Sequence, residues 1–140
     1  ATFPLQWRAA FVLPTDVLEA RFALRFRERL PRRSTVLYVG RAGLTVLTLP
    51  LYGGRGSTRV DDPRGWSLRI GEPLPELGES GGPVYYYESS LCDLSESRAL
   101  CAEARARFAG RVIGSVRLPA QNPYARYEHD SLVVRLVRVR

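Results

Sequence analysis

Apolar and polar residues alternate in several short stretches of the chain, and a period of two is typical of a β-strand with one buried face. The stretch 5–13 shows this most clearly, with Leu, Trp, Ala, Phe and Leu at every second position. Other short runs are rich in Val, Leu, Thr or Tyr, and some are apolar almost throughout. Together the runs predict strands over 5–13, 35–39, 44–49, 66–70, 84–88, 111–118 and 132–139.

A longer stretch near the start of the chain has the spacing of a helix. Leu18, Phe22, Phe26 and Leu30 recur at every fourth position, among residues of good helix propensity. The same stretch can also be aligned as a strand, with its arginines on one side and its phenylalanines on the other. Its length favours a helix over about 16–30.

A second helix is expected over about 94–109. Asp93 followed by Glu96 has the pattern of a helix cap, and Gly110 is a residue that commonly ends a helix. The inward-facing row of this helix would contain Leu100 and the residues Ser97, Cys101, Ala104 and Phe108.

The order of these elements predicts a single α+β domain over 1–140, with a mainly antiparallel sheet of about six to seven strands and two helices on one face. The short turn 40–43 predicts a hairpin of strands 35–39 and 44–49. Each half has the order strand–helix–strand–strand, a βαββ repeat of elements without a repeat of residues. Eight of the twelve glycines lie in 53–82, which predicts a Gly/Pro-rich acidic connector.

The composition is that of a globular domain, with 45% hydrophobic and 25% charged residues, and no apolar run approaches the length of a membrane span. The chain carries a net charge of +7, and every basic residue is Arg. Residues 1–60 and 104–140 are basic, at +7 and +6, whereas 61–103 are acidic, at −6. The middle segment either neutralises its flanks or forms an acidic face opposite a basic one, which would steer a partner.

Cys92 and Cys101 allow one disulfide at most. An unbroken helix from Asp93 would place them about 12 Å apart along its axis, whereas a disulfide needs Cα atoms within about 7 Å. Either the two residues are bonded and the helix begins later, near Ser97, or the helix begins at Asp93 and both thiols are free. The bonded alternative, which we favour, implies an oxidising, extracytoplasmic compartment.

Three motifs resemble catalytic or ligand sites without completing one. His129 has an acidic neighbour, Asp130, but residues adjacent on an extended segment point to opposite sides, so a catalytic pair needs an acid from elsewhere. Asp61 and Asp62 precede a proline, which is ordinary turn chemistry. The glycine-rich run 53–57 lacks both the Lys and the following helix of a phosphate loop. We therefore predict no catalytic residue, no metal site and no cofactor.

Arginine and tyrosine are the remaining candidates for recognition, because Arg binds phosphate and carboxylate in a forked geometry and Tyr stacks on bases. Codon bias in a GC-rich gene would enrich Arg equally well. The candidate phosphate or partner contacts are Arg21, Arg25, Arg27, Arg105, Arg107, Arg126, Tyr124 and Tyr127.

The sequence favours a non-catalytic interaction or assembly module that binds another protein through its surface and is exported. Its contacts are expected in the tyrosine-rich segments and in the connector 53–82. The alternative is an Arg-rich protein that binds nucleic acid. A second alternative is a small enzyme or ligand-binding fold with a pocket between its two halves.

Overall fold

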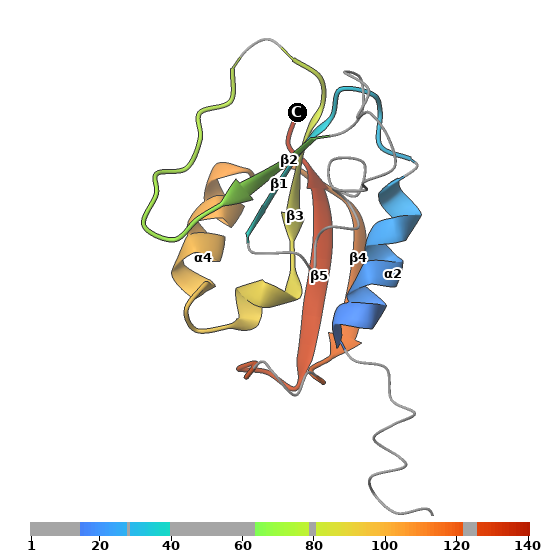
Figure 1. Cartoon of the computed structure of the whole chain (residues 1–140), viewed down its shortest axis with the longest axis vertical. Coiled ribbons are helices and arrows are strands. Elements are labelled where there is room, and N and C mark those ends of the chain that lie inside the picture. Colours follow the sequence, from blue (N-terminus) through green and yellow to red (C-terminus); the bar gives the residue numbers. More distant parts are fainter. Residues whose placement is uncertain (1–14, 28, 40–63, 79–80, 122–125) are drawn as a thin grey trace, which may run out of the picture.

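The structure, a computed structural model, describes residues 15–27, 29–39, 64–78, 81–121 and 126–140. A single sheet lies at the centre, with one helix on each of its faces (Figure 1). The helices are α2 (Thr15–Arg27) and α4 (Arg98–Arg107), and a short 3-10 helix, η2 (Ser90–Asp93), precedes α4. The strands are β1 (Thr35–Val39), β2 (Arg64–Leu68), β3 (Val84–Glu88), β4 (Arg111–Pro119) and β5 (Ser131–Arg138).

The sheet is mixed, which corrects the prediction of a mainly antiparallel one. Its order is β2-β1-β3-β5-β4, with β1 parallel to both of its neighbours and β5 antiparallel to both of its own. The described residues form five strands, fewer than the six to seven expected; the predicted strands 5–13 and 44–49 lie outside them. Because β2 and β3 occupy both edges of β1, the expected hairpin of 35–39 with 44–49 is wrong.

Helices on both faces explain why β1 and β3 are parallel to each other and mostly apolar. All five residues of β3 are buried, and so are four of the five in β1. Strands covered on both sides have no polar face and are typically parallel. The tyrosine-rich segment 85–87, where contacts with a partner were expected, is therefore buried instead, since Tyr85, Tyr86 and Tyr87 are at most 3% exposed. The same geometry corrects the expectation that both helices cover one face.

Helix α2 confirms the helical alternative for its segment, although it ends at Arg27 rather than near 30. Phe22 and Ala23 are buried against the sheet, while Arg21 and Arg25 are exposed. The helix begins at the buried Thr15, whose backbone N–H donates to Gln121 at 3.0 Å and whose hydroxyl donates to Pro119 at 2.5 Å. These bonds join the start of α2 to the end of β4.

Helix α4 begins at Arg98, four residues later than the cap pattern predicts. The residues before it form η2 and a turn, and Ser97 is the residue that precedes the helix. The predicted inward-facing row is buried as expected: Leu100, Ser97, Cys101, Ala104 and Phe108. The order β3, α4, β4, β5 confirms the predicted order of the second half, whereas two strands of the first half lie outside the described residues.

Each face of the sheet has its own core. The α2-side core is formed by Phe22, Ala23, Val36, Tyr38, Tyr85, Tyr87, Leu118, Val134 and Leu136. The α4-side core is formed by Leu37, Val39, Leu68, Leu74, Val84, Tyr86, Leu100, Cys101, Ala104, Phe108 and Val137. No helix of the described residues is long and apolar enough to cross a membrane, in keeping with the sequence.

Candidate functional site

The α4 side of the sheet is only partly covered by its helix. Paired residues of neighbouring strands share a face, and so does every second residue along one strand. Val137 belongs to the α4-side core, so Arg135, Val133 and the residues of β4 that pair with these three positions lie on the same side. Among them Val112 is 48% exposed and Val133 is 45% exposed. We call this surface the open β4–β5 face; it consists of Val112, Ser115, Arg117, Val133 and Arg135.

Two hollows lie where this face meets α4 and η2. One, of about 210 Å³, is lined by residues of η2, among them Asp93, by His129 and by the start of β5. The other, of about 140 Å³, lies near Phe108 and Gly110 at the far end of α4. Both are lined by Glu88 and Arg105. We treat them together as one groove, the α4 groove.

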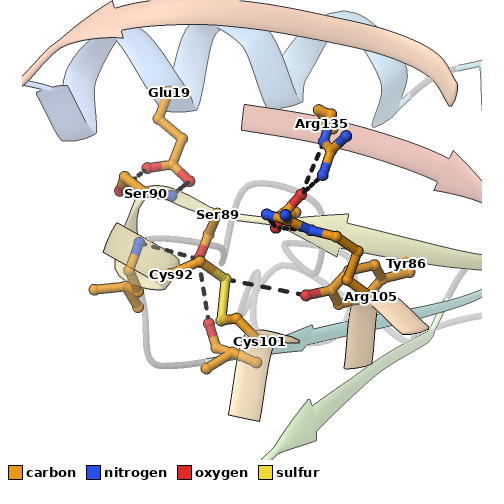
Figure 2. The surroundings of a disulfide bond; sticks show 11 residues. Glu19, Tyr86, Ser89, Ser90, Cys92, Cys101, Arg105 and Arg135 are labelled. Carbon is orange, nitrogen blue, oxygen red and sulfur yellow. Dashed lines mark hydrogen bonds and ion pairs between the residues drawn. A yellow bond between two sulfur atoms is a disulfide. The ribbon is translucent and has the colours of Figure 1, made fainter. Parts of the chain in front are cut away.

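Glu88 is the buried charge of this groove, with 2% of its surface exposed. Arg105 donates its Nε to Oε1 at 2.9 Å, and Arg135 donates its Nε to Oε2 at 2.8 Å. Each guanidinium also donates from Nη2 to the same oxygen. Figure 2 shows the two arginine side chains converging from α4 and from β5. The carboxylate is thus fully paired, as burial of a charge requires.

The two guanidinium groups retain binding capacity after this pairing. The Nη1 group of each makes no hydrogen bond with the described residues. The side chain of Arg105 is 63% exposed and that of Arg135 is 29% exposed. Because two positive groups share one negative group, the cluster has a net charge of +1. It can attract a carboxylate or a phosphate without losing its own structure.

The structure bonds Cys92 to Cys101, with sulfur atoms 2.12 Å apart and Cα atoms 5.6 Å apart. Of the two alternatives that the sequence left open, this is the one in which α4 begins near Ser97. The bond ties η2 to α4 beside Tyr86, whose hydroxyl lies 4.0 Å from Cys92 Sγ (Figure 2). Burial raises the pKa of the Tyr86 hydroxyl well above its usual value, and the nearby Glu88 raises it further.

His129 has an acidic partner that the sequence did not reveal. Its Nδ1 lies 2.5 Å from Oδ1 of Asp93, and its backbone N–H donates to Oδ2 at 2.9 Å. The capping role expected for Asp93 is therefore wrong, because the carboxylate binds His129 from the last residue of η2. An acid reaching the imidazole from elsewhere in the chain is what a catalytic pair requires.

A nucleophile for this pair is not evident among the described hydroxyl groups of the groove. Ser89 donates to the Val39 carbonyl at 3.4 Å, Ser90 donates to Glu19 at 2.5 Å, and Ser131 accepts from Arg117 at 3.2 Å. The two cysteines are bonded. Within the described residues, no three His, Cys, Asp or Glu side chains are grouped as metal ligands.

The arginines expected to contact phosphate do not form one surface. Arg21 and Arg25 lie on α2, whereas Arg105 and Arg107 lie on α4, on the opposite side of the sheet. Arg126 is exposed and Tyr127 is half-buried, in the segment before β5. The side chain of Arg27 and the residue Tyr124 lie outside the described part of the chain, as do 53–63 and 122–123.

In the connector, the predicted strand 66–70 is observed as β2, two residues earlier. Its Trp66 is 47% exposed and, with Pro73 and Pro75, lines a hollow of about 230 Å³. The described part of 53–82, where contacts with a partner were expected, therefore contains a hollow beside β2. Sequence reasoning missed Glu88 and Arg135, for which the one signal was a charge at the end of the run 84–88 and another within the run 132–139.

Comparison with protein-family models, with curated proteins and with solved structures finds no match for this chain.

Proposed function

We propose that this protein is a non-catalytic interaction module that binds a partner macromolecule through the open β4–β5 face and the α4 groove. The observation that carries the proposal is the exposure of Val112 and Val133 beside arginines, on the side of the sheet that α4 covers only in part. An apolar surface bordered by charged groups is typical of a binding surface.

The charge of the two strands supports the same conclusion. β4 and β5 carry four arginines and no acidic residue, and two of these arginines, Arg117 and Arg135, lie on the open β4–β5 face. The guanidinium groups of Arg105 and Arg135 are held in place by Glu88, so little side-chain entropy is lost when they bind a partner. A partner with acidic groups would be attracted to this face and oriented by it.

An exported location is part of the proposal, because disulfides persist in oxidising compartments. The bond between Cys92 and Cys101 supports it.

Nucleic-acid binding is the second candidate, favoured by the same four arginines of β4 and β5. It is less well supported, because single strands are bound by stacking on aromatic rings and the open β4–β5 face exposes valines instead. The exposed Trp66 lies on β2, at the other edge of the sheet.

A matched pair of double variants tests the proposed surface. The first, Arg117→Glu with Val133→Glu, reverses the charge of the open β4–β5 face. The control, Leu24→Glu with Arg25→Glu, makes the same change of charge on exposed positions of α2. Each protein is cross-linked to its partners in the source extract, and the partners are quantified by mass spectrometry.

We expect the control to capture the same partner as the wild type and the β4–β5 variant to lose about 90% of it or more, since reversed charge at a complementary interface is strongly unfavourable. Equal capture by both variants, or a loss confined to the α2 variant, would place the surface elsewhere. Capture that consists of nucleic acid and declines steeply with salt would favour the second candidate.

A further inference from the structure

β4 forms one end of the sheet order, and β5 is its only neighbour among the described strands. In such an edge strand, alternate residues direct their backbone N–H and C=O groups away from the sheet, where another strand can pair with them. The register of β4 shifts between Val112 and Gly114, which marks a bulge at Ile113. From Gly114 to Leu118 the pairing is regular, and Pro119, which lacks an N–H, ends it.

The two sides of this regular edge differ in chemistry. On the α4 side, Ser115 and Arg117 are exposed, beside Val133 and Arg135 of the neighbouring strand. On the α2 side, Ile113, Val116 and Phe26 are half-buried against the α2-side core. A strand added at this edge would therefore meet arginines on one of its faces and apolar side chains on the other.

The acidic residues near the edge already have partners or lie at its end. Glu88 is paired with two arginines, Asp93 with His129, and Glu128 with Arg98. Among the acidic side chains that the structure describes there, Asp130 is exposed just before β5, next to the Pro119 end of the edge. The positive charge of Arg117 on the open β4–β5 face is thus available to a partner.

From this we infer that the outer edge of β4, unpaired among the described strands, accepts an extended segment of a partner protein as an additional strand, and that the segment alternates acidic with apolar residues. The inference rests on the proposed function and names the partner of that surface. Backbone pairing at an edge supplies affinity, and the alternate side chains supply specificity. The acidic residues would face Arg117 and Arg135, and the apolar ones would cover Ile113, Val116 and Phe26.

A second copy of the chain is a poorer occupant of this edge. Pairing β4 with β4 would bring together two strands that carry arginines and no acidic residue. Like charges on directly neighbouring strands destabilise the pairing. An acidic segment has no such penalty.

The test uses the full chain and synthetic peptides of the same length as β4. The probe alternates Glu with Val, a second peptide alternates Lys with Val, and a third is the Glu–Val peptide N-methylated at alternate residues. N-methylation removes backbone N–H groups along one edge of the peptide and leaves its charge and side chains unchanged. Binding is measured by fluorescence anisotropy, and protection of β4 amides by hydrogen exchange.

We expect the Glu–Val peptide to bind and to slow exchange in 114–118. The Lys–Val and N-methylated peptides should bind about tenfold more weakly or worse, because one lacks the charge and the other the backbone pairing. Arg117→Glu should weaken binding of the Glu–Val peptide by about the same factor, whereas Arg25→Glu on α2 should leave it unchanged.

The outcomes separate this inference from the proposed function. If N-methylation has no effect while Arg117→Glu abolishes binding, the surface is correct and strand addition is wrong. If the peptide fails to bind while the cross-linking test succeeds, the partner is of another chemistry. Slow exchange of 114–118 in the free protein would show that the edge is already covered, by a second copy if the protection depends on concentration. Tighter binding of single-stranded DNA at the same residues would also overturn the inference.

Discussion

Glu19 and Glu88 are both buried, one on each side of the sheet, and they are satisfied by different means. Glu19, on α2, accepts hydrogen bonds from the Tyr87 hydroxyl at 3.1 Å, the Ser90 amide at 3.1 Å and the Ser90 hydroxyl at 2.5 Å. Glu88, on β3, is held by two guanidinium groups. The donors that the described residues supply to Glu19 are neutral, whereas those around Glu88 are charged and partly exposed.

This difference indicates that Glu19 attaches elements of the fold to one another, whereas Glu88 holds groups that can bind a partner. The bonds of Glu19 connect α2 to β3 and η2 inside the protein, and its neutral donors Tyr87 and Ser90 are buried with it. The pairing of Glu88 instead leaves an excess of positive charge in the hollow of the α4 groove that lies near Phe108 and Gly110. The α2 side therefore stabilises the fold, and the α4 side is the one from which binding is expected.

The largest predicted effect is a loss of stability at high pH, and it tests whether the buried tyrosines on the two sides of the sheet are equally inaccessible to solvent. Tyr86 faces the α4 side and Tyr87 the α2 side, and burial raises the pKa of each well above the usual 10.0, with Glu88 and Glu19 respectively adding to it. The unfolded chain therefore releases both protons at a pH where the folded protein keeps them. The stability that the two groups contribute is fully present below about pH 10 and is lost as the pH rises toward the folded pKa values.

Between about pH 10 and about pH 11.5 the free energy of unfolding should fall by about 3 kcal/mol from these two groups together. Urea unfolding at several pH values measures this slope. Tyr86→Phe and Tyr87→Phe should each remove about half of it. A variant that leaves the slope unchanged would show that its tyrosine is accessible to solvent in the folded protein.

The disulfide gives the next effect, which should be confined to the α4 side. Replacing Cys92 and Cys101 by Ala should lower the free energy of unfolding by about 2.5 kcal/mol, the chain-entropy value for a short loop. Hydrogen exchange should become faster in η2 and α4 and stay unchanged in α2. Reductant should lower the stability of the wild type by a similar amount and leave the variant unaffected. Faster exchange in α2 would show that the two sides are not independent.

The smallest effect concerns the charge cluster itself. Glu88→Gln keeps the shape of the side chain but weakens its bonds to Arg105 and Arg135, so the free energy of unfolding should fall by about 2 kcal/mol. Glu103→Gln, on the exposed surface of α4, is the matched control and should change it by less than about 0.5 kcal/mol. Thermal unfolding of both variants at the same pH makes the comparison. Equal losses would indicate that the stability depends on the net charge of the protein and not on the bonds of Glu88 to the two arginines.

Local features of the chain were predictable, and pairing between distant segments was not. Neighbouring residues predict the strands 35–39 and 84–88 and the helical row that contains Phe22. They also predict that a bond between the two cysteines requires a late start of α4. The partners of Glu88 lie 17 and 47 residues away, on elements whose positions depend on the register of the sheet. No local pattern contains that register.

The direction of the strands did leave a signal in the sequence. The runs 35–39 and 84–88 are apolar without alternation, which is typical of strands covered on both faces. Alternation in 111–118 correctly indicated a strand with one open side, and the open β4–β5 face lies there. The partner of His129 was not predictable, because the pattern of Asp93 and Glu96 fits a helix cap equally well.

The hydrogen bonds of Thr15 have a consequence for how the protein is made. They join residues 104 positions apart, so the start of the first described helix gains these partners only when the strand before Gln121 exists, later than the contacts of Phe22 with Tyr87 and of Glu19 with Ser90 can form. At ordinary rates of translation, Thr15 is made about 5 to 20 s before Pro119. During that interval α2 lacks its attachment to β4, and a chaperone that shields apolar segments would increase the yield of folded protein.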